Sequence, residues 1–448
     1  MSDFLLNYLR LRRICKGRRP SDRPCAGDCF FADDATADAA MVNIYYQISL
    51  TGFGSGDANS VGFHCALSSD EINYLGFSPP AEYNQFSDNA LTANNSALSF
   101  MWNDMYSAIY KACAVMEGLN SSSGVTDATK KQLLGEAKFI RAFCYFYLVN
   151  LWGDVPLVLT TDYKANNIML RTATGQVYQQ IISDLKDAES LMLDNYSYSA
   201  NQRVRANKGV ATALLARVYL FTGDWANAEA ESSVLISNTS QYSLEPNLLK
   251  VFSTISKEAI IQFWGQQFPN ELNAFAIDPS YGIFGGVLNR QFVDGFEPGD
   301  QRAAVWIGSI LFGGNTFYGP IKYQDYAIPP NDYSTVLRLA EQYLIRAEAC
   351  ANQNKLAAAI ADINEIRNRA GLPNTTASTQ SDLLDAVLQE RRAELFTEWG
   401  HRWLDLKRTG RANAVLGPLK PGWKQEDSLY PIPESQLISN PAIKQNPS

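Results

Sequence analysis

Histidine is scarce in this chain: its 448 residues include two, His64 and His401. The sequence also lacks the patterns GxSxG, GxxxxGK and HExxH, which place nucleophilic serines, phosphate-binding loops and zinc ligands in many enzymes. Nothing in the sequence therefore indicates a common hydrolase, nucleotide-binding or zinc-protease chemistry. His401 precedes Arg402, and we expect it to pair with charges at a helix end rather than to act as a base.

Cysteine is present but is not arranged as a disulfide framework. Three of the seven cysteines, Cys15, Cys25 and Cys29, lie in the first 29 residues, and the other four are scattered. The Cys25–Cys29 spacing has no matching His or Cys pair downstream, so we expect no zinc site. Long apolar runs are absent as well, because no segment approaches the ~20 uninterrupted apolar residues of a membrane-spanning helix.

Charged residues are also few, at 19% of the chain, whereas aromatic residues reach 12%. This balance is typical of a globular protein with surplus aromatic side chains for its core or a binding surface. The net charge is −8, and residues 1–28 are basic, so the rest of the chain is more acidic than this total. An acidic body repels nucleic acid, and we expect no nucleic-acid partner.

The strongest local signal is an apolar stripe at helical period between residues 133 and 151. Neighbouring Phe and Tyr residues widen the stripe, which predicts a helix buried on most sides. The helix should end at Trp152, because Gly153 allows a left-handed turn and Pro156 forbids further helix. The stripe consists of Leu133, Ala137, Ile140, Cys144, Tyr147 and Leu151.

Other helices are predicted in pairs, which favours an all-α fold. Residues 206–221 and 225–236 are spaced like a tetratricopeptide hairpin that turns at Gly223, and residues 338–353 and 356–370 form a similar unit. Such hairpins bury their faces by stacking on each other. Two further helices are expected at residues 96–119 and 175–193.

Three long motifs stand out in the sequence. The first comprises Glu136, Ala137, Arg141, Ala142, Tyr145 and Trp152 to Pro156. The second is LQERRAELFTEWGHRWLDLKR, residues 388–408, and the third is the ending LYPIPESQLISNPAIKQNPS. These motifs resemble those of the SusD/RagB family, the surface-exposed glycan-binding lipoproteins of Bacteroidetes. The family-like region begins near Phe30, where FADDATADAAMVNIYYQI resembles the family's first helix.

The resemblance implies a non-catalytic protein with a tetratricopeptide-like helical-pair scaffold and an irregular, loop-rich insertion. Such a protein would sit on the outer membrane, bind a glycan or another nutrient, and pass it to a SusC-like TonB-dependent transporter. It implies no cofactor, no metal and no catalytic residue. Residues 1–29 contain neither a signal peptide nor a lipobox, so a lipid anchor is expected from the family and is not visible in this sequence.

We expect one SusD-like domain over residues 30–448 and an N-terminal segment, residues 1–29, outside it. The helical scaffold should occupy residues 30–238 and 333–411. Residues 239–332 should form the ligand-binding insertion, and residues 412–448 a C-terminal tail.

Sugar binding requires exposed aromatic rings beside polar groups, and two segments combine both in predicted loops. Residues 51–94 are rich in glycine and aromatic residues, and residues 239–332 hold many scattered aromatic rings. We therefore predict a joint binding face. Its candidate residues are Trp264, Trp306, Tyr83, Phe86 and Tyr281.

Two other functions stay open at this stage. Asp294, Glu297 and Asp300 cluster in the insertion, and two carboxylates suffice for glycoside hydrolysis, although turn chemistry explains the cluster equally well. A tetratricopeptide scaffold that binds protein segments is the other alternative. The acids and arginines of the 388–408 motif fit an acidic ligand or helix-clamping ion pairs, and we favour the ion pairs.

Overall fold

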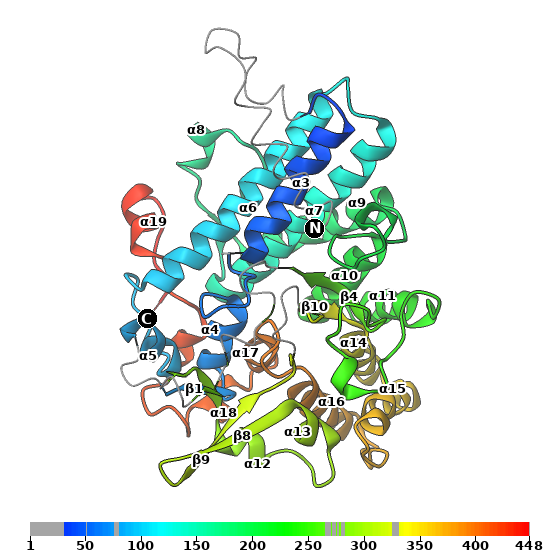
Figure 1. Ribbon diagram of the computed structural model, residues 1–448. Coiled ribbons are helices and arrows are strands. Elements are labelled where there is room, and N and C mark those ends of the chain that lie inside the picture. Colours follow the sequence, from blue (N-terminus) through cyan, green and yellow to red (C-terminus); the bar gives the residue numbers. More distant parts are fainter. Residues whose placement is uncertain are drawn as a thin grey trace.

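The computed structural model describes residues 31–50, 52–75, 80–264, 270, 275, 277–278, 283–324 and 331–447. The expected segment outside the domain, residues 1–29, lies outside these described residues. Helices make up most of the described chain, and the strands found there form pairs rather than a large sheet (Figure 1). The predicted all-α class is confirmed.

Three long helices, α3 (Asp34–Leu50), α6 (Ser96–Ser121) and α7 (Asp127–Trp152), run side by side (Figure 1). α7 is the predicted central helix and is buried along most of its length. It begins at Thr126, whose hydroxyl accepts a hydrogen bond from the Thr129 amide, and it ends at Gly153, where φ is 74°. Val155–Pro156 then forms strand β2, so the predicted helix end and extended exit are both confirmed.

Two helical hairpins stack next to this bundle, as the sequence predicts. The first is α10 (Lys208–Thr222) and α11 (Trp225–Ser237), and the second is α14 (Leu339–Asn352) and α15 (Leu356–Arg369). Gly223 turns the first hairpin with a φ of 73°, and Asn354 turns the second with a φ of 59°. α11 packs on α14, which buries the apolar faces of both hairpins.

Among the other helices, α9 (Thr174–Leu191) packs on α7 and on α10 of the first hairpin, and α16 (Gln380–Glu394) packs on both helices of the second hairpin. None of the described helices combines the length and apolarity that a bilayer crossing requires. Shorter helices are α8 (Tyr163–Asn166), α17 (His401–Arg408), α18 (Ala412–Leu416) and α19 (Glu434–Ser439).

Residues 51–94, expected as one long loop, contain two helices and a strand within their described part. α4 (Val61–Ser68) is buried at every residue, and the Ser60 hydroxyl caps it by accepting from Phe63 N at 3.2 Å. An eight-residue apolar helix of this kind has no amphipathic period, which is why the sequence pattern does not reveal it. β1 (Ile72–Tyr74) and α5 (Ala81–Ser87) follow.

The insertion at residues 239–332 is built from short strand pairs and two short helices. β4 (Ala259–Phe263) pairs with β10 (Ser334–Arg338), which lies just beyond the insertion, and β7 (Gly286–Leu288) pairs with β1. β8 (Ile307–Phe312) and β9 (Asn315–Pro320) form a hairpin. The insertion also contains the pair β5 (Ile277–Asp278) and β6 (Ile283–Phe284), and the helices α12 (Arg290–Asp294) and α13 (Gln301–Trp306). Outside the insertion, β3 (Arg171–Thr172) pairs with β2.

Buried ion pairs join the insertion to the C-terminal helices. The Arg338 guanidinium contacts Glu258 at 2.9 Å, Glu394 at 2.6 Å and Glu398 at 2.7 Å. Arg302 of α13 reaches the other oxygen of Glu394 at 3.2 Å. Each side chain is almost fully buried, so loss of one member would leave an uncompensated charge in the interior.

Candidate ligand-binding site

The two segments expected to form a binding face meet through the β1–β7 pair. Tyr74 lies opposite Gly286, and Asn73 donates a side-chain hydrogen bond to Asn289. A Cβ at Gly286 would lie 2.7 Å from Ile72 Cδ1 and 3.0 Å from Phe275 Cδ1, so glycine here makes room for these side chains to pack against the strand. The two segments therefore lie next to each other, as the sequence predicts.

Aromatic rings form two layers at this junction. Tyr83 of α5 and Tyr74 of β1 are partly exposed, and their ring centres lie 5.0 Å apart. Beneath them, the buried Phe63 ring lies 5.4 Å from Tyr83, and buried Phe86 stacks on His64 at 4.3 Å. The buried layer fixes the orientation of the two tyrosine rings, which offer apolar faces and hydroxyl groups at the surface.

Trp264 follows β4 and is half-buried. Its backbone carbonyl accepts a hydrogen bond from the Ser49 hydroxyl at 2.7 Å, which fixes this end of β4 to α3. Of the five candidate residues named from the sequence, Trp264 and Tyr83 are the two that retain partial exposure in the described structure.

The structure corrects the expectation for Trp306 and Phe86. Trp306 has no exposed surface, and its indole N–H donates to the Leu248 carbonyl at 3.0 Å. Phe86 is also fully buried, against His64 and Tyr430. Both rings are core residues without a face open to a ligand. Tyr281 lies outside the described residues.

Tyr74 is a partly exposed aromatic residue of the junction that the candidate list omitted. The alternation Ile72-Asn73-Tyr74 places Tyr74 on the same side of the strand as buried Ile72, so the sequence pattern does not reveal its exposure. Leu75, next to it, is also exposed. The pairing with Gly286 fixes this strand at the surface, and that partner is more than 200 residues away in the sequence.

Two buried ionisable side chains flank the junction. Burial lowers the pKa of His64 to about 3, and neither ring nitrogen has a hydrogen-bond partner among the described residues. Burial raises the pKa of Glu71 to about 8, and the neighbouring Asp70 raises it further, while the Thr397 amide donates to its carboxyl group at 3.1 Å. At neutral pH both side chains are therefore predominantly uncharged.

The acids of the insertion are held in ion pairs. Asp294 contacts Arg290 at 2.8 Å on the surface, and Glu297 contacts Arg367 at 2.6 Å. Asp300 is buried, caps α13 through the Arg302 amide and pairs with the Arg302 guanidinium at 2.8 Å. The three carboxylates thus serve different arginines rather than facing each other.

The charged residues of the 388–408 motif mostly clamp helices together, as we favoured. Arg391 and Arg408 each donate to Asp405 at 2.7 Å, and Arg402 forms two hydrogen bonds with Asp70, at 2.7 and 2.8 Å. Buried His401 has a pKa well below its usual value because of burial and nearby cations, Arg217 first. No group of three or more His, Cys, Asp or Glu suited to a metal ion occurs among the described residues.

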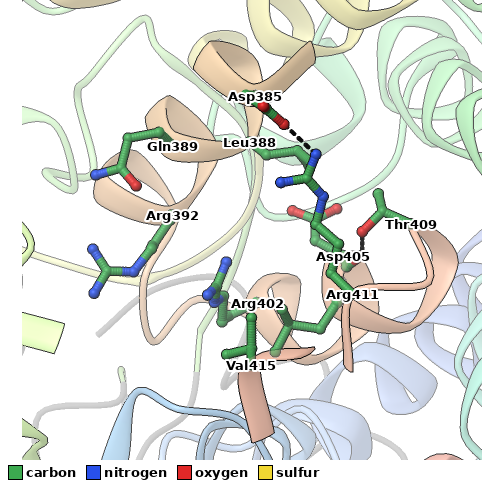
Figure 2. Close-up of a pocket in the computed structure, with 10 residues that line it drawn as sticks. Asp385, Leu388, Gln389, Arg392, Arg402, Asp405, Thr409, Arg411 and Val415 are labelled. Carbon is green, nitrogen blue, oxygen red and sulfur yellow. Dashed lines mark hydrogen bonds and ion pairs between the residues drawn. The ribbon is translucent and has the colours of Figure 1, made fainter. Parts of the chain in front are cut away.

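One cavity opens beside this motif. Figure 2 shows its lining side chains, which come from α16, α17, α18 and the turn before α18, with Asp385 of α16 directed at Arg411. Its volume is about 200 Å³, and its lining includes three arginines. The sequence showed these arginines but gave no sign of the cavity, because the three helices meet only in the folded chain.

Two family models match this chain. The model described as "Starch-binding associating with outer membrane" matches residues 66–220, and the model described as "SusD family" matches residues 330–448. Among curated relatives, SusD-like protein P38 of Formosa agariphila is 25% identical over 443 residues, covering 84% of each chain. The starch-binding protein SusD of Bacteroides thetaiotaomicron is 25% identical over 425 residues, covering 73% of this chain and 75% of the relative.

Solved structures of similar proteins share the fold. A SusD superfamily protein from Bacteroides vulgatus superposes with a TM-score of 0.81 at 21% identity, covering 93% of this chain and 99% of the other. A laminarin-binding SusD-like protein gives a TM-score of 0.77 at 26% identity, covering 92% and 98%. Because the two matched segments together span more than half of its residues, the chain belongs to the SusD/RagB family.

Proposed function

We propose that this protein binds a glycan without cleaving it and passes oligosaccharide to a SusC-like TonB-dependent transporter. Residues 30–448 would act as one domain at the surface of the outer membrane, held by a lipid anchor. Family membership supports this role, as do the starch-binding and laminarin-binding proteins among its relatives and structural neighbours. The words "associating with outer membrane" in the matched family description support the location.

The observation that carries glycan binding is the pair of partly exposed rings, Tyr74 and Tyr83, on a rigid buried layer. Sugars present C–H faces that stack on such rings and hydroxyl groups that need polar partners. Asn73 is exposed next to Tyr74 and offers an amide group. Trp264, after β4, is a further partly exposed ring that we include among the candidate contacts. A platform held by packing loses little entropy on binding, which favours affinity.

A non-catalytic role is supported by the ion pairs of the acidic residues in the insertion. Glycoside hydrolysis needs one carboxyl group as an acid and a second as a base or nucleophile on opposite sides of one bond. Asp294, Glu297 and Asp300 instead contact Arg290, Arg367 and Arg302.

Binding assays with starch and laminarin test the glycan proposal. We expect purified protein to bind at least one of them without releasing reducing ends. Tyr83→Ala, Tyr74→Ala and Trp264→Ala should each weaken binding, by on the order of 2 kcal/mol for a central ring. Tyr163→Ala serves as the control, since this ring on α8 is more exposed and belongs to another part of the surface.

Unchanged affinity in all three folded variants would refute the aromatic site, and release of reducing ends would refute the non-catalytic role. Binding of extended peptides in place of glycans would favour the tetratricopeptide-scaffold alternative. The transporter partnership is tested separately: the tagged protein, purified from outer membranes in mild detergent, should retain a TonB-dependent transporter. Recovery without one would contradict that part of the proposal.

A further inference from the structure

The cavity of Figure 2 is lined by helices of the C-terminal motif and not by the aromatic residues of the candidate glycan face. It is half-open, with a volume of about 200 Å³. Its charged and polar lining residues include Asp385, Gln389 and Arg392 of α16, Arg402 and Asp405 of α17, and Arg411 before α18.

The two carboxylates at this cavity are already neutralised by arginines. Asp405 accepts hydrogen bonds from Arg391 Nε and Arg408 Nε, each at 2.7 Å. Asp385 forms an ion pair with Arg411 across the mouth of the cavity, as Figure 2 shows. Neither carboxylate therefore leaves negative charge that would call for a bound cation.

The arginines keep unused hydrogen-bond donors. Arg402 binds Asp70 through Nε and Nη2, which leaves its Nη1 group. Arg411 uses one Nη2 hydrogen bond with Asp385, which leaves most of its guanidinium donors. The donors left over at the cavity therefore belong to positively charged groups.

Arg392 differs from the other two arginines of this cavity in its contacts. It forms no ion pair with any residue in the described part of the chain. Its Nη2 donates to the Phe292 carbonyl at 3.0 Å, and its guanidinium lies 4.3 Å from the centre of the Phe292 ring. Burial lowers the pKa of Arg392, and the nearby positive charge of Arg402 lowers it further, although Asp70 acts in the opposite direction.

We propose that this cavity binds a small oxyanion, a carboxylate or a sulfate group, against Arg392, Arg402 and Arg411. Guanidinium groups present paired N–H donors in the plane that such oxyanions accept. The volume is below the roughly 300–1,000 Å³ of pockets for drug-sized ligands, which fits a free anion or a single acidic sugar unit. The proposal goes beyond the glycan-binding role and does not depend on it.

Titration calorimetry of the full chain with sodium sulfate, sodium galacturonate and glucose tests the proposal. We expect saturable binding of sulfate and galacturonate, competition between them, and weaker binding as sodium chloride is added. Glucose at the same concentration should not bind this site. If galacturonate binds at least tenfold more tightly than sulfate, the oxyanion belongs to an acidic sugar. If the two affinities are equal, the site binds a free anion.

Variants assign the binding to the cavity. Arg392→Gln keeps a donor for the Phe292 carbonyl but removes the charge, and Arg411→Gln changes an exposed residue that the fold does not require. Each should weaken oxyanion binding at least tenfold. Arg290→Gln, an exposed arginine on α12 outside the cavity, should leave it unchanged.

The absence of saturable binding by both anions would overturn the proposal. Unchanged affinity in both folded cavity variants would also overturn it, because the anions would then bind elsewhere. Starch or laminarin binding, measured on the same variants, should stay at the wild-type level. Tyr83→Ala should weaken starch or laminarin binding and leave oxyanion binding unchanged. Failure of the oxyanion site and failure of the glycan face are therefore distinguishable.

Discussion

Arg141 of α7 and Asp184 of α9 form a two-pronged ion pair inside the protein. Arg141 Nε lies 2.8 Å from Asp184 Oδ2, and Arg141 Nη2 lies 2.7 Å from Asp184 Oδ1. The Asp184 side chain is almost completely buried. This pair fixes the packing of the two helices, so the arginine of the first family motif has a structural task.

Replacing Arg141 by Ala should therefore destabilise the fold without affecting the glycan face. The change leaves Asp184 buried and unpaired, which costs about 3–5 kcal/mol. Urea unfolding measures this loss. The Arg290→Ala control breaks an exposed pair and should cost less than about 1 kcal/mol. Normal stability combined with lost glycan binding in Arg141→Ala would contradict the structural role.

Trp306→Ala should act on stability and not selectively on binding. The ring is fully buried against Phe252 and Phe396, so its removal leaves a cavity and should cost about 3–5 kcal/mol. Chemical denaturation measures the free energy of unfolding of Trp306→Ala and of Tyr83→Ala. The Tyr83→Ala change should cost less stability, because Tyr83 is partly exposed. A Trp306→Ala variant that keeps wild-type stability and loses only glycan affinity would show that the ring reaches the ligand.

His64 should make the protein less stable in mild acid. Burial lowers its pKa from 6.5 to about 3, so its stabilising effect is complete above pH 6.5 and is lost as the pH falls towards 3. The slope is about 1.4 kcal/mol per pH unit. His64→Phe keeps an aromatic ring beside Phe86 and removes this titration. Unfolding free energies at pH 6.5 and 5 should show a loss about 2 kcal/mol smaller in the variant. An equal loss in both proteins would mean that His64 binds its proton equally in the folded and unfolded states, so that burial does not lower its pKa.

Glu71 should have the opposite pH dependence. Burial, with Asp70 beside it, raises its pKa from 4.5 to about 8, so the stability contribution of the protonated form is complete below pH 4.5 and is lost as the pH rises through 8. Glu71→Gln keeps an acceptor for the Thr397 amide without the titration. The variant should therefore lose less stability than the wild type between pH 5 and 8.

Denaturant titrations at pH 5, 6.5 and 8 measure this difference. Glu434→Gln, on the exposed surface of α19, provides the matched control and should follow the wild type at every pH. Parallel pH profiles of the wild type and Glu71→Gln would show that the Glu71 carboxyl group is solvated in the native protein.

The helical scaffold was predictable because its signals are local. The central helix ends at Trp152 as expected, since Gly153 and Pro156 stop a helix whatever surrounds it. The second helix of the first hairpin was predicted at residues 225–236 and spans Trp225–Ser237. Apolar period and turn residues lie within a few positions of the structure that they specify.

For the candidate binding face, the sequence predicted which two segments meet but not which of their aromatic rings are exposed. Trp306 and Tyr83 both lie in aromatic, loop-rich sequence, but Trp306 is covered by Phe252 and Phe396, whereas Tyr83 remains partly open. Whether a ring is exposed depends on the residues that pack against it, and these can lie far away in the sequence. The pairing of Tyr74 with Gly286 illustrates this dependence.

The sequence alone determined the family, the helical hairpins and the two segments that meet at the junction, because apolar period, turn residues and long motifs carry that information locally. The tertiary structure decided which charges pair directly. Arg392 and Arg402 belong to one motif and look equivalent in the sequence, but Asp70, 332 positions away from Arg402, forms an ion pair with Arg402 and not with Arg392. Charge compensation depends on distance in space, which packing alone sets.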